Sequence, residues 1–104
     1  MLPIDEELKA RLNSETGQLG WPELQRHFAR GVVVVVATGM DLVDVAARIS
    51  MDDGESVGHW LAQEKIHRAS TADAQRWHDS NARFWAVVVA PWVVVQELPP
   101  QLDS

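Results

Sequence analysis

Five consecutive valines, from Val32 to Val36, limit what this chain can fold into more than any other feature of its sequence. β-Branched side chains lose rotamer freedom in a helix and pack well on a pleated sheet, so the run predicts a β-strand. Because every position is apolar, the pattern is typical of a strand that is covered on both faces. We therefore expect Val32 to Val36 to be the central strand of a small sheet.

The second valine-rich segment, from Phe84 to Glu97, is also β in composition and is interrupted at Pro91. It predicts either a hairpin that turns at Ala90-Pro91-Trp92 or one long strand with a bulge at the proline. A tight hairpin usually takes glycine or asparagine in its turn, and a proline inside a central ladder removes a hydrogen bond. We favour the hairpin, and both arrangements stay open.

Helical signals occupy most of the remaining sequence. The segment from Lys65 to Ala69, between two of the predicted helices, is an extended connector or a short edge strand. Five short helices are expected, and their signals are the four-residue spacing of Ile4, Leu8 and Leu12; Pro22 with Leu24 and Phe28; Asp41 as a cap before Leu42, Val45 and Ile49; Val57, Trp60 and Leu61; and the pair Ser70 and Asp73, which resembles a capping box.

These elements together predict an α/β fold, with α+β as the alternative, in which about five short helices pack on a mixed sheet of three to four strands. A length of 104 residues is usual for a single domain. We expect residues 1–97 to form one globular domain. Residues 98–104 contain the paired prolines Pro99 and Pro100, which cannot continue a strand ladder, so we expect a loose C-terminal tail.

The composition is that of an ordinary soluble domain, with 46% hydrophobic and 23% charged residues. No apolar stretch approaches the ~18 residues that a membrane-spanning helix needs. Asp5, Glu6 and Glu7 stand where a secretory signal carries basic residues, so we expect a cytoplasmic protein. The absence of cysteine excludes disulfides, thiolate metal sites and cysteine nucleophiles. A net charge of -6 disfavours nucleic-acid binding, which depends largely on Lys and Arg.

The order and spacing of the valine segments and the helices between them resemble a family of small bacterial proteins, the domain of unknown function family 2288. The likeness extends from about Leu8 to Glu97. It implies a bacterial, cytoplasmic protein and carries over no activity, cofactor or catalytic residue. The residues that carry it are Arg30 to Ala37, Gly39, Asp41 to Ala46, Trp60-Leu61, Ile66 and Trp85 to Glu97.

One turn and the helix after it hold the best candidate for a ligand or metal site, formed by Asp52, Asp53, Glu55 and His59. Clustered carboxylates can hold a cation, and Glu55 and His59 are four residues apart on one predicted helix. We favour a structural role, because Asp-Asp-Gly is ordinary turn chemistry and also supplies a helix cap. The histidines at 27, 59, 67 and 78 lie on different predicted elements, and we expect no cofactor and no dedicated metal.

The hairpin segment from Trp85 to Glu97 is expected to be the exposed pairing surface of the sheet. Bare valine-rich edges aggregate, so we expect them to be covered by self-association, most simply as a homodimer through the hairpin edge or its outer face. The residues expected at this interface are Trp85, Val87, Val89, Trp92 and Val94.

No catalytic motif is present, so we expect a small interaction or regulatory module that acts through contacts with itself or with an unidentified protein partner, rather than an enzyme. The competing hypothesis is a small ligand- or metal-binding protein or enzyme built on residues 52–59. That hypothesis requires His59, His67 or His78 beside the carboxylates in a common pocket. Single-stranded nucleic-acid binding is a third, disfavoured class, indicated only by tryptophans that alternate with arginines.

Overall fold

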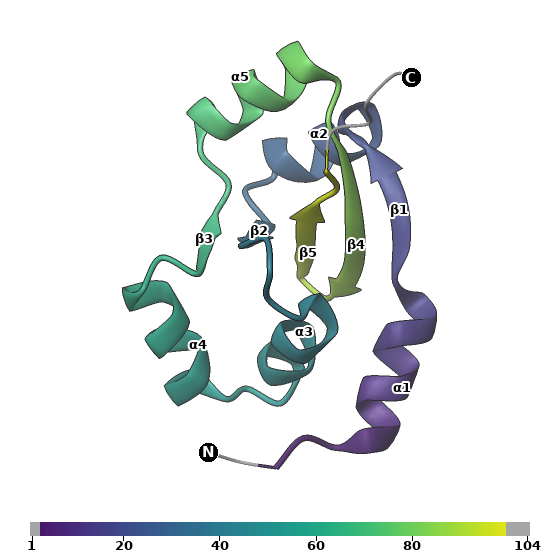
Figure 1. The fold of residues 1–104 in the computed structure, drawn as a ribbon, viewed down its shortest axis with the longest axis vertical. Helices are drawn as coiled ribbons and strands as arrows, with labels where there is room; N and C mark the ends of the chain where they lie inside the picture. The colour runs from purple at the N-terminus through teal and green to yellow at the C-terminus, as the bar shows by residue number, and fades with distance from the viewer. Residues whose placement is uncertain (1–2, 100–104) are drawn as a thin grey trace.

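The computed structural model describes residues 3–99, which form one twisted mixed sheet flanked by helices (Figure 1). Residues 100–104, most of the predicted C-terminal tail, lie outside the described residues. In chain order the elements are α1 (Glu6–Glu15), β1 (Gly17–Gly20), α2 (Trp21–Ala29), β2 (Val33–Val36), α3 (Leu42–Ser50), α4 (Gly54–Ala62), β3 (Ile66–Arg68), α5 (Thr71–Ser80), β4 (Arg83–Val89) and β5 (Trp92–Glu97).

The strands run in the order β1-β4-β5-β2-β3. β2 and β5 are parallel, and the other three neighbouring pairs are antiparallel. The predicted α/β class is confirmed, with five strands in the described chain instead of three to four. The strand that sequence analysis missed is β1, whose Gly-Gln-Leu-Gly sequence has a single apolar residue. Its extended conformation comes from pairing with β4.

The two valine segments take the predicted local structures, but the hairpin and not β2 supplies the middle strand of the sheet. β4 and β5 form the favoured hairpin, and the Ala90-Pro91 bond in its turn is cis. Residues 33–36 are at most 8% exposed, so β2 is covered on both faces as predicted. The middle strand is nevertheless β5, because β1 extends the sheet beyond the hairpin on one side while β2 and β3 extend it on the other.

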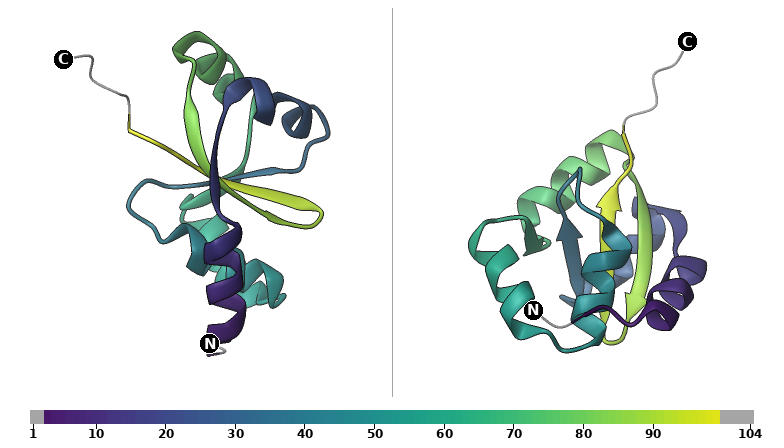
Figure 2. Two further views of the ribbon diagram at one scale, coloured as in Figure 1. Left: turned by 90° about the vertical axis from the view of Figure 1, so that its right-hand side faces the viewer. Right: turned by 60° about the horizontal axis from the view of Figure 1, so that its bottom comes forward.

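Two helical layers cover the sheet. Figure 2 shows α2 and α5 gathered on one side and α1, α3 and α4 on the other. The first layer packs Leu24 and Trp77 against Val33 and Val35. The second packs Leu12 and the apolar face of α3 on Val34, Val36, Val87 and Val94. Alternate strand residues therefore enter opposite cores, as the period of two along a strand requires.

Polar caps at two helix starts agree with the sequence prediction. The Asp41 carboxylate accepts hydrogen bonds from the N–H groups of Val43 and Asp44 at 3.0 and 3.2 Å. Ser70 and Asp73 form a reciprocal capping box at the start of α5. Each cap satisfies backbone donors that the first helical turn leaves without a partner. Within the described chain, no helix is long and apolar enough to span a membrane.

Candidate functional site

Asp53, the centre of the predicted carboxylate site, forms a buried ion pair with Arg48. It caps α4, where its Oδ1 accepts from the Ser56 N–H at 3.2 Å. Its Oδ2 accepts from the Ser56 hydroxyl at 2.8 Å and from Arg48 Nη1 at 3.1 Å. These hydrogen bonds, the Ser56 bonds most strongly, lower the pKa of Asp53 against the opposing effect of burial. The contacts join the end of α3 to the start of α4, as the structural role predicted.

The other three predicted site residues do not gather around Asp53. Asp52 is exposed at a positive φ of 57° between α3 and α4. Glu55 and His59 are both exposed on α4. In residues 3–99, no group of three or more His, Asp or Glu side chains is placed to hold a metal ion.

One histidine, His67, contacts a carboxylate, and it does so on the opposite face of the sheet from α4. Its Nε2 lies 2.9 Å from Asp73 Oδ2, and Arg76 Nη1 donates to Asp73 Oδ1 at 3.1 Å. Arg76 Nη2 also donates a hydrogen bond to Glu97 Oε2 at 2.9 Å, so this network links β3, α5 and β5. His67 thus contacts a carboxylate of α5 and not one from residues 52–59, and His78 Nδ1 lies 3.4 Å from Oδ1 of its neighbour Asp79.

Two of the five residues expected at a dimer interface are buried inside the chain. Val87 and Val94 are 1% and 0% exposed, because α1 and α3 cover that face of the hairpin. The hairpin also has no free edge, since β4 pairs with β1 and β5 pairs with β2. Trp85 is exposed, whereas Val89 and Trp92 are half-buried. A partner can reach only these three of the five expected residues.

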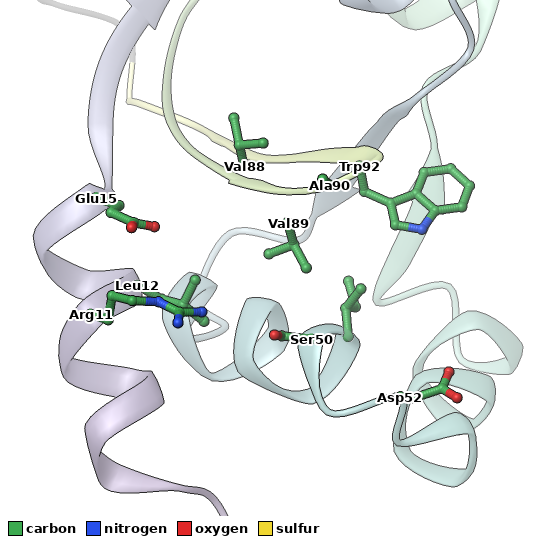
Figure 3. A pocket seen from close by; sticks show the side chains of 10 residues that line it. Arg11, Leu12, Glu15, Ser50, Asp52, Val88, Val89, Ala90 and Trp92 are labelled. Carbon is green, nitrogen blue, oxygen red and sulfur yellow. The ribbon is translucent and has the colours of Figure 1, made fainter.

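A cleft of about 500 Å³ opens beside the hairpin turn (Figure 3). We call it the hairpin cleft. Figure 3 shows Arg11 and Glu15 of α1 at one end and Asp52 at the other, with Val89 of the hairpin between them. It brings predicted site and interface residues together, but its polar groups are widely spaced. Its lining is Arg11, Leu12, Glu15, Ile49, Ser50, Asp52, Val88, Val89, Ala90 and Trp92.

Ile49 and Trp92 also line a second cavity of about 190 Å³, which we call the Trp92 groove. It lies between α3, α4 and the β2–β3 side of the sheet, and most of its lining is apolar. Leu61, on α4, is 49% exposed. The full lining is Val34, Ile49, Val57, Leu61, Ile66, His67, Arg68 and Trp92.

The Trp92 groove carries one cation, Arg68. The guanidinium carbon lies 5.4 Å from the centroid of the Trp92 ring, within cation–π range. Arg68 Nη2 also donates to the Gly31 carbonyl oxygen. Among the described residues, no carboxylate pairs with Arg68, so an apolar cavity is bordered by a positive charge that has no ionic partner here.

Sequence analysis missed this groove because its walls come from five elements, β2, α3, α4, β3 and β5, that the fold brings together. One signal was available on α4, where Val57, Trp60 and Leu61 form an apolar face. Val57 and Trp60 pack on the core, while Leu61 stays outside it. A single exposed apolar residue is common on protein surfaces, so Leu61 becomes informative only through the apolar cavity that it lines.

A family model described as "Protein of unknown function (DUF2288)" matches residues 7–97. The chain belongs to this family. The DUF2288 chain is also similar to the NMR solution structure of PA1075 from Pseudomonas aeruginosa, with 38% sequence identity and a TM-score of 0.80. That match covers 100% of this chain and 96% of the other. No curated protein matches the sequence. The resemblance expected from the valine segments is confirmed, and neither name assigns an activity to this DUF2288 chain.

Proposed function

We propose that this protein is an interaction module that binds a segment of a partner protein in the Trp92 groove. The observation that carries the proposal is an exposed leucine, Leu61, in the lining of an apolar cavity that also contains Trp92 and Arg68. Binding energy at protein interfaces concentrates where large apolar anchors fill desolvated pockets. A groove of this size accommodates one anchor side chain rather than a whole domain face.

The competing site at residues 52–59 has less geometric support. Asp53 already uses both carboxylate oxygens inside the chain. Glu55 and His59 line neither the hairpin cleft nor the Trp92 groove. Only Asp52 of this turn lines a cavity, the hairpin cleft, so a ligand there would meet one carboxylate of the predicted site and no histidine.

Selection from a random peptide library displayed on phage tests the proposal, with the purified protein as the immobilised target. We expect the selected peptides to share one large apolar residue. In calorimetric titrations, Leu61→Ser should weaken their binding at least about tenfold, because the leucine contributes apolar contact area.

Val88→Ser is the matched control, because Val88 is the most exposed large apolar residue described and lies outside the Trp92 groove. It should leave the affinity of the selected peptides unchanged. Peptides without a shared apolar residue, or equal losses of affinity in the two variants, would overturn the proposal.

A further inference from the structure

The guanidinium of Arg68 has unused hydrogen-bond donors at the border of the Trp92 groove. Of the N–H groups that it carries, only one on Nη2 donates within the described chain, to the Gly31 carbonyl oxygen. Its contact with the Trp92 ring is a cation–π interaction, which uses no N–H group. The side chain is also exposed. The remaining N–H groups of Arg68 can therefore bind a carboxylate through parallel hydrogen bonds.

Among the described residues, Arg68 is the one permanently charged side chain in the lining of the groove. The His67 imidazole contacts Asp73 on the opposite face of the sheet. Glu64 and Lys65 carry opposite charges, and neither lines the groove. In Figure 1, β3 runs from α4 toward α5, so these two residues stand at its α4 end and Arg68 at its α5 end. The groove thus favours an anion in one place, beside Arg68.

The apolar part of the groove lies within reach of this cation. The Arg68 guanidinium carbon is 5.4 Å from the centroid of the Trp92 ring, and Trp92 itself lines the groove. Leu61 is 49% exposed, so the groove is accessible from the α4 side. Its volume of about 190 Å³ suits one large side chain and is too small for a long acyl chain. A group bound against Trp92 can therefore place a carboxylate on Arg68 only if that carboxylate is attached close to it.

This compact arrangement distinguishes between the carboxylates that a protein partner carries. In a C-terminal residue, the α-carboxylate and the side chain are attached to the same Cα, so one residue can fill the groove and reach Arg68. An Asp or Glu carboxylate inside a segment belongs to a different residue from the apolar anchor. Holding that second side chain in place costs additional conformational entropy. The geometry therefore favours a chain end over an internal acidic residue.

We infer that the Trp92 groove binds the C-terminal residue of a partner protein, through a large apolar side chain and its free α-carboxylate. This inference rests on the proposed function and specifies its partner. The side chain contacts Trp92, Leu61 and Val57 in the groove, and the carboxylate accepts hydrogen bonds from Arg68. Capture of a C-terminal carboxylate is a selective form of peptide recognition, because each polypeptide has a single α-carboxylate.

Two synthetic peptides that differ only in their C-terminal group test the inference. Both have the sequence acetyl-Gly-Ser-Gly-Ser-Gly-Leu, one with a free carboxylate and one with an amide, and each is titrated into the ¹⁵N-labelled full-length protein. We expect the free acid to shift the signals of the Trp92 indole N–H and the Arg68 backbone N–H. The amide form should bind about threefold to tenfold more weakly, and salt should reduce the difference. Repulsion by the net charge of -6 would have the opposite effect.

A third peptide, with its last two residues exchanged so that it ends in Leu-Gly with a free carboxylate, is the matched control. It has the same composition and charge, but its leucine and its α-carboxylate are on different residues, so it should bind more weakly than the terminal-leucine acid.

On the protein side, Arg68→Gln should remove the difference in affinity between the acid and amide forms. Lys65→Gln makes the same change in net charge about 10 Å away along β3, at about 3.3 Å per residue, and should preserve that difference. The comparison of acid and amide needs no altered protein, so it decides the question even if Arg68→Gln does not fold.

Equal binding of the acid and amide forms would overturn the inference and would indicate an internal segment as the occupant. Groove signals that shift with protein concentration in the absence of peptide would overturn it as well, because a second copy would then be the occupant. If Leu61→Ser weakens peptide binding while the acid and amide forms bind equally, the proposed function stands and C-terminal recognition fails. If no peptide binds in a way that depends on Leu61, the proposed function fails, and the inference fails with it.

Discussion

Asp73 joins two elements of the molecule, α5 and β3, through one carboxylate. Partial burial raises its pKa, but hydrogen bonds from the Ser70 N–H, His67 and Arg76 outweigh that effect and lower the pKa to about 2 from an ordinary 3.8. The same contacts cap α5 and connect it to β3. The charged form of this residue is therefore bound more favourably in the folded chain than in the unfolded one.

Asp73→Asn should show how stability depends on this charge. Because the folded pKa lies below the unfolded value, the contribution of the ionised carboxylate is complete above about pH 4 and declines as the pH falls toward 2. We expect Asp73→Asn to unfold at a lower temperature than the natural protein at about pH 5. The gap between their midpoints should narrow as the pH decreases.

Thermal unfolding followed by circular dichroism across this pH range measures that gap. Asp79→Asn, which removes a carboxylate from the same helix, controls for the change in net charge. A gap between Asp73→Asn and the natural protein that stays constant from about pH 5 to pH 2 would contradict the assignment.

At the scale of elements, β4 places some side chains in each of the two cores and another in solvent. Phe84 and Ala86 pack beneath α2 and α5, while Val87 packs beneath α1 and α3. Val88, the next residue, is 60% exposed. Two adjacent valines in one strand thus differ almost completely in burial, which makes them a matched pair for testing the register.

Val87→Ala should reduce the free energy of unfolding by about 2 kcal/mol, because it removes buried methyl groups and leaves a cavity. Val88→Ala should change it by no more than about 0.5 kcal/mol, as expected at an exposed position. Urea denaturation of the two variants and the natural protein measures both values. Similar losses in the two variants would mean that the strand does not alternate as described.

Local chemistry made some elements predictable. The valine run indicated β2, and the polar residues Asp41 and Ser70 marked two helix starts, because each signal depends on a few neighbouring residues. β1 was missed and β5 was not expected in the middle, because strand order depends on pairings between segments far apart in sequence. Of the candidate site, Asp53 was placed correctly as a cap, while the Trp92 groove depends on five elements meeting and could not be derived from spacing.

At the scale of the whole molecule, the sheet ends in two edges of different chemistry. The β3 edge is cationic, whereas β1 contains no charged residue. The Trp21 N–H donates to the Ala82 carbonyl, so alternation along the β1–β4 ladder turns the backbone of Gln18 outward. Trp85, opposite Gln18, is 39% exposed. A neutral edge beside an exposed tryptophan can pair with its own copy without like-charge repulsion.

We therefore expect the homodimer to form through the β1 edge and not through the hairpin edge. Two copies related by a twofold axis at Gln18 would continue one sheet into the other and cover part of Trp85. Sedimentation velocity at micromolar concentration should show a dimer for the natural protein. Gln18→Pro removes only an outward N–H and should give a monomer, while Gln18→Ser should remain dimeric. A stable natural monomer would contradict self-association, and a dimeric Gln18→Pro variant would place the interface elsewhere, because no ladder hydrogen bond to β4 depends on that amide.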